Sequence, residues 1–325
     1  MIYITVLITA YNRKAYLIKA VDSVLYQTLN RDYYEIIVIK NFKDNYIDDY
    51  LTNNNIKNII MDGTEGDYIL KGMEEAKGKI ISFLDDDDIF HNEKLQNVYE
   101  IFSKYDDLIY YHNAFLEIDK NDNLLDLNSD NIRASNFNDF IINQKHNKSV
   151  LNGLKHLSDF NLSSISVAIS INNREYVSHI SRMTDTSLFY LALTHDGTIY
   201  ISSKRLTLIR YHVSTSRPPI NNKNVMLASL QHNNISQIIL FIQNYCKDYP
   251  FYNLVQCMFY SNRIMEQLVK NEYHNVFRNV IHFFKCIFLL NFKKRLGLII
   301  IYVISYILKD NKLFVVLFKR IENRH

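Results

Sequence analysis

The chain has 325 residues, of which 48% are hydrophobic and 22% are charged, and its formal net charge is +3. This composition excludes an intrinsically disordered protein, and the small net charge gives no general reason to expect a nucleic-acid partner. The length suits one large domain with an appendage, or two domains.

The first hundred residues alternate between strand and helix patterns. Residues 2–8 are apolar and β-branched, which predicts a buried parallel strand; the run is too short, and lacks the basic start, for a signal peptide. Asn12 is a candidate start for the helix that follows it. Further strands are predicted at residues 35–39, 57–61 and 79–84, and further helices at residues 68–76 and 92–103. This alternation indicates a doubly wound, mostly parallel α/β sheet.

The middle of the chain, residues 108–211, mixes the two patterns with less regularity. Strands are predicted at residues 108–118, 163–171, 198–202 and 206–212, and a helix at residues 185–194. After Pro218 and Pro219 the pattern becomes helical throughout. We therefore predict two parts: an α/β domain at residues 1–217 and a helical C-terminal region at residues 218–325.

Four consecutive aspartates, Asp85 to Asp88, directly follow the strand predicted at residues 79–84. Adjacent carboxylates repel one another, and a Mg²⁺ or Mn²⁺ ion, which prefers hard oxygen ligands and often shares them with substrate phosphates, would compensate the charge. Ligands of open α/β sheets bind at the carboxyl ends of the strands. The sequence therefore predicts a metal site here, with a solvated acidic turn that caps the next helix as the alternative.

Four segments, in order, resemble the family-two inverting glycosyltransferases with the GT-A fold. They are an apolar strand that ends in a Tyr-Asn turn, a helix that ends in Ser-Val-Leu-Tyr-Gln-Thr, a second strand, and a segment that ends in Phe-Leu-Asp-Asp-Asp-Asp: residues 5–13, 20–28, 35–39 and 75–88. The resemblance covers residues 2–105 closely and residues 160–216 more loosely. It implies a GT-A-type sheet, a nucleotide-sugar donor, a Mn²⁺ or Mg²⁺ ion and a glycan or lipid-linked acceptor.

The same resemblance implies roles for the acidic segment and for the turn after the first strand. Asp87 would be the main metal ligand, whereas Asp85 and Asp86 would lie near the ribose and diphosphate of the donor. Asp88 could instead cap the next helix. The turn would line the nucleotide pocket through four residues: Thr9, Ala10, Tyr11 and Asn12.

Two positions depart from the family pattern. Family members usually carry Asp-Asp-Gly-Ser after the second strand and read the base with the second aspartate, whereas this chain has Asn41 in that segment. The amide of Asn41 can still accept or donate a hydrogen bond. The family arginine that precedes the acidic segment is also missing; Lys71 could meet a phosphate in its place, or it could be a surface lysine.

The catalytic base is expected further along the chain, because inversion requires a carboxylate that deprotonates the acceptor hydroxyl. Thr184-Asp185 is similar to the family's Glu-Asp pair at the start of a helix, with Asp185 in the base position and Thr184 in place of the usual glutamate. The alternative for Asp185 is a plain helix-capping aspartate. Residues 208–216 resemble the family's ending, in which His212 would meet the metal or the diphosphate and Arg210 would neutralise the diphosphate.

The C-terminal third contains short apolar stretches between basic residues. The longest uninterrupted stretch, Leu296 to Leu308, is shorter than the roughly 20 residues that a membrane-spanning helix needs. Its basic flanks favour helices that lie on an anionic membrane surface through residues 277–320; a helical subdomain packed on protein is the alternative. The three cysteines of this third match neither a metal site nor a disulfide framework, so we expect buried thiols in a reducing compartment.

Taken together, these features predict a metal-dependent, inverting glycosyltransferase that is cytoplasmic and peripheral on the cytoplasmic face of the membrane. Two alternatives remain from the sequence. One is a nucleotidyl- or phosphotransferase that uses the same metal cluster. The other is a catalytically inactive binding or assembly subunit, which the departures at Asn41 and Leu70 keep open.

Overall fold

The structure is a computed structural model, and it describes residues 2–125, 138–143, 161–178, 180, 184–211, 256, 260, 263–264, 267 and 273–288. The chain divides into two compact units, residues 1–217 and residues 218–325. The site residues expected from the sequence all belong to the first unit. His212 lies outside the described residues, as do residues 289–320 of the expected membrane-binding segment.

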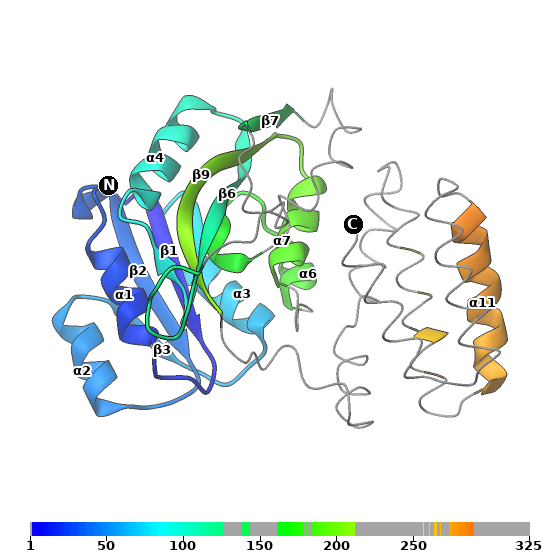
Figure 1. The fold of residues 1–325 in the computed structure, drawn as a ribbon, viewed down its shortest axis with the longest axis horizontal. Coiled ribbons are helices and arrows are strands. Elements are labelled where there is room, and N and C mark those ends of the chain that lie inside the picture. The colour runs from blue at the N-terminus through cyan, green and yellow to red at the C-terminus, as the bar shows by residue number, and fades with distance from the viewer. Residues whose placement is uncertain are drawn as a thin grey trace. The chain divides into compact units, whose positions relative to one another are not determined.

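The described part of the first unit is built on a nine-stranded sheet (Figure 1). Its strands in chain order are β1 (Ile4–Ala10), β2 (Tyr34–Lys40), β3 (Lys57–Ile60), β4 (Ile80–Asp85), β5 (Ile89–Phe90), β6 (Leu108–Ile118), β7 (Phe140–Asn143), β8 (Ile165–Ala168) and β9 (Thr198–Arg210). Their order across the sheet is β3-β2-β1-β4-β8-β6-β9-β5, with β7 on β9. Strands β1 to β4 are mutually parallel, β8 runs against β4 and β6, and β6 is parallel to β9. The predicted doubly wound, mostly parallel sheet is confirmed.

Helices cover both faces of the sheet. In the first unit they are α1 (Leu17–Leu25), α2 (Asn45–Asn53), α3 (Glu65–Glu75), α4 (Lys94–Lys104), α6 (Arg174–Ser178) and α7 (Thr184–Leu193). Because successive side chains of a strand point to opposite faces, Val6 and Ile8 pack with α1, α2 and α4, whereas Leu7 contacts α3 at Gly72. Tyr110 likewise meets Phe189 of α7, with ring centroids 5.6 Å apart.

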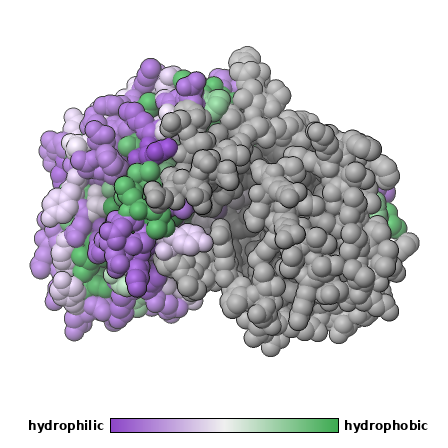
Figure 2. All heavy atoms as spheres, in the orientation of Figure 1, coloured by the Kyte–Doolittle hydropathy of each residue, from purple (hydrophilic) through white to green (hydrophobic). Residues whose placement is uncertain are grey.

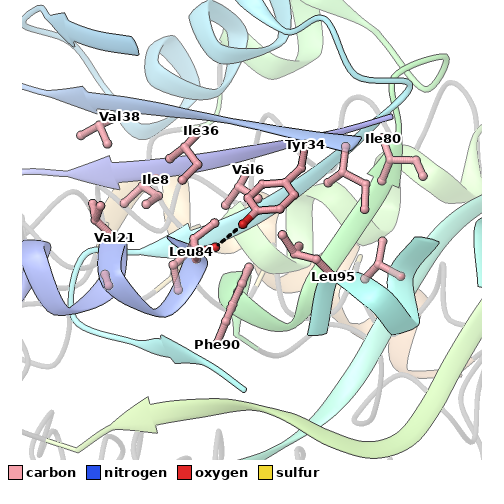
Figure 3. Close-up of a cluster of buried hydrophobic side chains, with 14 of the residues drawn as sticks. Val6, Ile8, Val21, Tyr34, Ile36, Val38, Ile80, Leu84, Phe90 and Leu95 are labelled. Atoms are coloured by element: carbon pink, nitrogen blue, oxygen red, sulfur yellow. Dashed lines mark hydrogen bonds between the residues drawn. The ribbon is translucent and has the colours of Figure 1, made fainter. Parts of the chain in front are cut away.

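A cluster of buried hydrophobic side chains, which includes Val6 and Ile8, fixes the position of the acidic segment (Figure 3). It contains Leu84 and Phe90, the buried residues on the two sides of the four aspartates, together with Leu95 of α4. Tyr34 also belongs to the cluster, and its phenol donates a hydrogen bond to the carbonyl of Val24, at 2.8 Å. The aspartates therefore sit on a short turn that is held in the core at both ends.

The structure differs from the sequence reading at several elements. Helix α2 was not predicted, because its polar sequence buries only Ile47 and Leu51; it starts where the Asp44 side chain accepts a hydrogen bond from the Ile47 amide, at 3.2 Å. Residues 198–210 form one strand, β9, rather than the two strands that were predicted. The polar residues between the two predicted strands stay within β9, because the register of its pairing with β6 shifts there. The short elements β7 and α6 were also missed.

Helix α11 (Tyr273–Phe288) belongs to the second unit. Phe283 and Cys286 are buried, and His282 stacks on Tyr260 with ring centroids 5.0 Å apart, whereas Lys285 is exposed. One face of α11 therefore packs against protein. None of the helices that the structure describes is long and apolar enough to span a membrane.

Most of the visible surface of the described residues is hydrophilic (Figure 2). Apolar side chains appear on it in small groups, as is usual for a folded protein surface.

Candidate functional site

Parallel pairing brings three of the sequence-predicted segments to one edge of the sheet. Thr9 of β1 lies beside Asp85 of β4, and Ala10 lies beside Lys40 of β2. The Tyr11-Asn12 turn, Asn41 and the four aspartates follow directly from these positions, at the carboxyl ends of the three strands. This is the edge at which open α/β sheets bind ligands.

Two asparagines join the turns that follow β1 and β2. The Asn12 amide donates a hydrogen bond to Asn41 Oδ1 at 2.8 Å, and Asn41 Nδ2 donates one to Asn12 Oδ1 at 2.9 Å. Asn12 has a φ of 56°, a left-handed conformation that asparagine tolerates better than most residues. Next to this pair, the Tyr11 ring is 61% exposed, so its face is open to a planar ligand. The donor-base role of Asn41 remains a prediction.

The four aspartates are not equivalent, and Asp88 is the most enclosed by its partners. It accepts hydrogen bonds from Ser163 Oγ at 2.6 Å, from the Arg210 amide at 2.9 Å and from Asn161 Nδ2 at 3.1 Å. Burial raises the pKa of Asp88 to about 6, against the opposing effect of these bonds. Asp88 does not cap the next helix, whose N-cap position is Glu93. Its role is to fasten the acidic turn to two distant segments.

Arg13 pairs with the two middle aspartates and was not anticipated from the sequence. Its Nε donates a hydrogen bond to Asp86 Oδ1 at 2.9 Å, and its Nη1 lies 2.6 Å from Asp87 Oδ2. Asp86 is 2% exposed, and burial raises its pKa to about 7 against the opposing effect of Arg13. The turn at Asn12 directs Arg13 toward these carboxylates, which is a tertiary effect without a sequence signal of its own.

Asp85 ends β4 and is half-buried. Burial of its carboxyl group and the negative charges of Asp88 and Asp87 raise its pKa well above the ordinary value. Asp86 Oδ2 is also buried without a hydrogen-bond partner among the described residues. Excess negative charge on hard oxygen ligands is the chemistry that Mg²⁺ and Mn²⁺ fit. Among the residues that the structure describes, no group of three or more His, Cys, Asp or Glu side chains that could hold a metal ion is found.

Arg210 is buried and holds the backbone of the acidic turn. Its Nε donates a hydrogen bond to the Asp87 carbonyl at 2.8 Å, and its Nη1 lies 2.5 Å from Asp122 Oδ1. The guanidinium also covers the ring of Tyr16, at 4.2 Å from the centroid. As described, Arg210 anchors the acidic turn, and its expected action on a diphosphate remains a prediction.

Lys71 lies on α3 and pairs with Glu75 one turn later, with 2.6 Å between Nζ and Oε1. This contact fits the surface-lysine alternative that the sequence left open. Direct contact of Lys71 with a phosphate remains a prediction.

Asp185 comes from a distant segment and is linked to the acidic turn through Asn161. Asp185 Oδ2 accepts a hydrogen bond from the Asn161 amide at 2.9 Å, and the side chain of Asn161 donates one to Asp88. Asn161 has a φ of 66°, and this left-handed turn lets its backbone and side chain face both aspartates. Asp185 Oδ1 also accepts a hydrogen bond from the Thr186 amide at 2.7 Å, within the first turn of α7. Asp185 therefore lies in the first turn of α7 and is at the same time linked to the acidic turn through Asn161.

Buried polar groups around Lys94 support the segment that carries the link between Asp185 and Asp88. Lys94 is fully buried, and its ammonium group donates hydrogen bonds to the carbonyls of Ser163 and Ser164 at 3.4 and 3.3 Å and to Asn113 Oδ1. Desolvation lowers its pKa well below the ordinary value of a lysine. The strand predicted at residues 163–171 forms at Ile165–Ala168 as β8, whereas Leu162–Ser164 form a short 3-10 helix whose Ser163 holds the acidic turn.

Comparisons with known proteins identify a matching family. Residues 5–161 match the family described as "Glycosyl transferase family 2". The uncharacterized glycosyltransferase alr2836 of Nostoc sp. is 32% identical over 130 residues, which are 38% of this chain and 39% of that protein. The chain thus spans well under half the length of this curated relative.

Solved structures share the fold. S. aureus TarS 1–349 in complex with UDP-GlcNAc has a TM-score of 0.55 at 12% identity, over 86% of this chain and 89% of that one. A further S. aureus TarS structure has a TM-score of 0.52 at 11% identity, over 87% of this chain and 54% of that one. At this identity the likeness shows the fold alone, which is of the GT-A type.

Two adjacent buried serines give a matched test of how the acidic turn is held. Ser163 Oγ donates to Asp88 and accepts from the Asp85 amide at 2.9 Å, whereas Ser164 Oγ has no hydrogen-bond partner among the described residues. Ser163→Ala should lower the free energy of unfolding by about 1–3 kcal/mol, because it leaves buried groups unpaired. Ser164→Ala should change it by less than about 0.5 kcal/mol. Urea unfolding measures both values, and equal effects would contradict this account of the turn.

Proposed function

We propose that the chain transfers a sugar from a nucleotide-diphosphate donor to an acceptor hydroxyl, with inversion and with a divalent cation, because residues 5–161 match the family described as "Glycosyl transferase family 2". One observation carries this proposal: the Tyr11-Asn12 turn follows β1 directly beside Asp85, at the carboxyl ends of β1 and β4. The Asn161 link joins Asp185 to Asp88, the last carboxylate of the same acidic run.

The donor would lie along the carboxyl ends of β1, β2 and β4. The exposed ring of Tyr11 offers a face to the base or ribose, and Thr9 and Ala10 supply the floor of the turn. The second N–H of the Asn41 amide remains to select the base, since its other N–H is used by Asn12. The diphosphate would then lie near Asp85 and Asp87.

A Mn²⁺ or Mg²⁺ ion would be held by Asp87, with Asp85 beside it, and His212 is the expected additional ligand from outside the described residues. Such an ion, when bound, neutralises negative charge on the leaving diphosphate. The chain's own contribution is to hold the carboxylates in place through Ser163 and Arg210.

Asp185 would act as the general base. Its carboxylate accepts hydrogen bonds from the Asn161 and Thr186 amides, which fix its direction. A hydroxyl of a glycan or lipid-linked acceptor would lose its proton to Asp185 as its oxygen attacks the anomeric carbon. Inversion follows, because attack comes from the side opposite the diphosphate.

We further propose that residues 277–320 contact an anionic membrane surface, which would place the protein on the cytoplasmic face of the membrane. The exposed Lys285 of α11 and the basic run Lys293-Lys294-Arg295 support this proposal. A lipid-linked acceptor would suit such a location.

The first prediction for this function concerns Asp87. We expect Asp87→Ala to weaken Mn²⁺-dependent binding of the donor at least about tenfold, because it removes the main expected ligand of the cation. Titration calorimetry with UDP-, GDP- and dTDP-sugars, with and without EDTA, measures this; uridine nucleotides come first because S. aureus TarS 1–349 was solved with UDP-GlcNAc. Asp49→Ala, an exposed aspartate on α2, is the control. A wild-type chain that binds no donor, or binds it equally in EDTA, would contradict the proposal.

The second prediction separates binding from chemistry at Asp185. Asp185→Asn keeps an oxygen that can accept a hydrogen bond from the Asn161 amide, but it cannot take a proton. We expect a loss of transfer of roughly 10²- to 10⁴-fold, with the donor dissociation constant unchanged within about twofold. Asp196→Asn, in the exposed loop after α7, is the control. Cleavage between the two phosphates of the donor, rather than at the anomeric carbon, would identify a nucleotidyl- or phosphotransferase instead.

The third prediction concerns the membrane. The full chain should sediment with vesicles that contain anionic lipid and dissociate as salt is raised, because charge attraction is screened. Replacing Lys293, Lys294 and Arg295 by glutamate should release it. The control replaces three exposed lysines of the first unit by glutamate: Lys77, Lys79 and Lys104. Equal behaviour of the two triple variants, or no binding at all, would rule out this membrane contact.

A further inference from the structure

Asn161 is the residue at which the segment of the expected base meets the acidic turn. Its backbone amide donates a hydrogen bond to Asp185 Oδ2 at 2.9 Å, and its side-chain Nδ2 donates one to Asp88 Oδ2 at 3.1 Å. One residue thus makes both contacts, the first from its backbone and the second from its side chain. The position of Asn161 therefore sets the separation of these two carboxylates.

The backbone of Asn161 rests on a rigid support. Its carbonyl accepts a hydrogen bond from the Ser164 amide at 3.2 Å, at the start of the short 3-10 helix. The Ser163 carbonyl in this helix accepts hydrogen bonds from Lys94 Nζ at 3.4 Å and from Thr207 Oγ1 at 3.1 Å. Lys94 and Thr207 are both fully buried. Such support is what a positioning residue needs, because a catalytic group has to be held to within about 0.5 Å.

The conformation of Asn161 is unfavourable in itself. Its φ of 66° combines with a ψ of 115°, which lies outside the left-handed helical region. Its Oδ1 is buried and has no hydrogen-bond partner among the described residues, while Nδ2 is turned toward Asp88. Both features cost stability, and glycine would adopt the same φ without strain. Strain of this kind is found where a fixed geometry serves function.

The proposed reaction depends on the geometry that Asn161 provides. The base must meet the acceptor hydroxyl while the acceptor oxygen attacks a donor that is held at the acidic turn. A displacement of about 1 Å between two such groups can lower the rate about a hundredfold. The distance from the acidic turn to Asp185 is therefore a quantity that the reaction requires to be fixed.

We propose that Asn161 is a positioning residue, which sets the place of the Asp185 carboxylate relative to the acidic turn. Its backbone amide orients Asp185, and its side chain fastens that amide to the turn through Asp88. This inference rests on the proposed function, since it requires that Asp185 be the base and that the donor bind at the acidic turn.

Asn161→Gly separates this role from a structural one. Glycine adopts a positive φ without strain and keeps the amide that donates to Asp185, but it lacks the side chain that reaches Asp88. The assay measures release of the nucleoside diphosphate from UDP-, GDP- and dTDP-sugars, with Mn²⁺ and with water as the acceptor. We expect kcat to fall at least about tenfold, with KM for the donor unchanged within about twofold.

The melting temperature provides the readout for structure. It should stay within about 3 °C of the wild-type value in Asn161→Gly, because relief of the strained φ offsets the lost hydrogen bond. Asn55→Gly is the matched control. Asn55 is exposed in the turn after α2 and has a φ of 54°, so this variant makes the same substitution away from the site and should keep the wild-type kcat and KM.

An exchange of the two side chains gives a second test. Asn161→Asp alone places a further carboxylate between Asp88 and Asp185, so kcat should fall at least as far as in Asn161→Gly. Combining it with Asp88→Asn should recover most of the lost kcat, because the amide introduced at position 88 can donate to the carboxylate introduced at position 161.

The outcomes distinguish this inference from the proposed function. If Asn161→Gly keeps the wild-type kcat, the inference is wrong while the proposed function stands. The same holds if the variant loses kcat and melting temperature together and the exchange restores neither, because Asn161 is then only structural. If the wild type releases no nucleoside diphosphate from any of the donors, the proposed function fails and the inference fails with it.

Discussion

The buried hydrogen bonds of Asp88 hold the candidate site together. Asp88 accepts from Ser163, Asn161 and the Arg210 amide, so one carboxylate joins the end of β4, the segment before β8 and the end of β9. Through Asn161 the same network reaches Asp185, some hundred residues away in sequence. Such bonds are expensive to lose because their partners are buried, which makes the relative placement of the aspartates a property of the fold rather than of the turn alone.

Charge compensation explains the remaining architecture around the four aspartates. Arg13 meets the carboxylates of Asp86 and Asp87, whereas Arg210 holds the backbone beneath them. Neither arginine removes the electrostatic repulsion at Asp85, because burial and the negative charges of Asp88 and Asp87 still raise its pKa. The site therefore retains a negative potential that suits a cation shared with a diphosphate.

The first half of the sheet was predictable because its signals are local. The apolar runs of β1, β2 and β4 are buried on both faces, and apolar residues at helical spacing identify α1 and α4. Helix α2 lacked that signal, since its stability comes from two buried residues and a cap. Arg13, Asn161 and Lys94 were missed for a different reason: their partners are contributed by segments 19 to 73 residues away.

By itself, the sequence determined the resemblance: an acidic run at the end of a buried strand, within an ordered set of segments, is similar to the family-two glycosyltransferases and predicts metal-assisted transfer from a nucleotide sugar. Only the tertiary structure decided what each residue does there. It made Asp88 a group that fastens the acidic turn rather than a helix cap, and it turned Arg210 toward the backbone of that turn. The physical reason is that residue type and spacing report hydrogen-bonding capacity, whereas the partner that uses this capacity is chosen by the packing of distant segments.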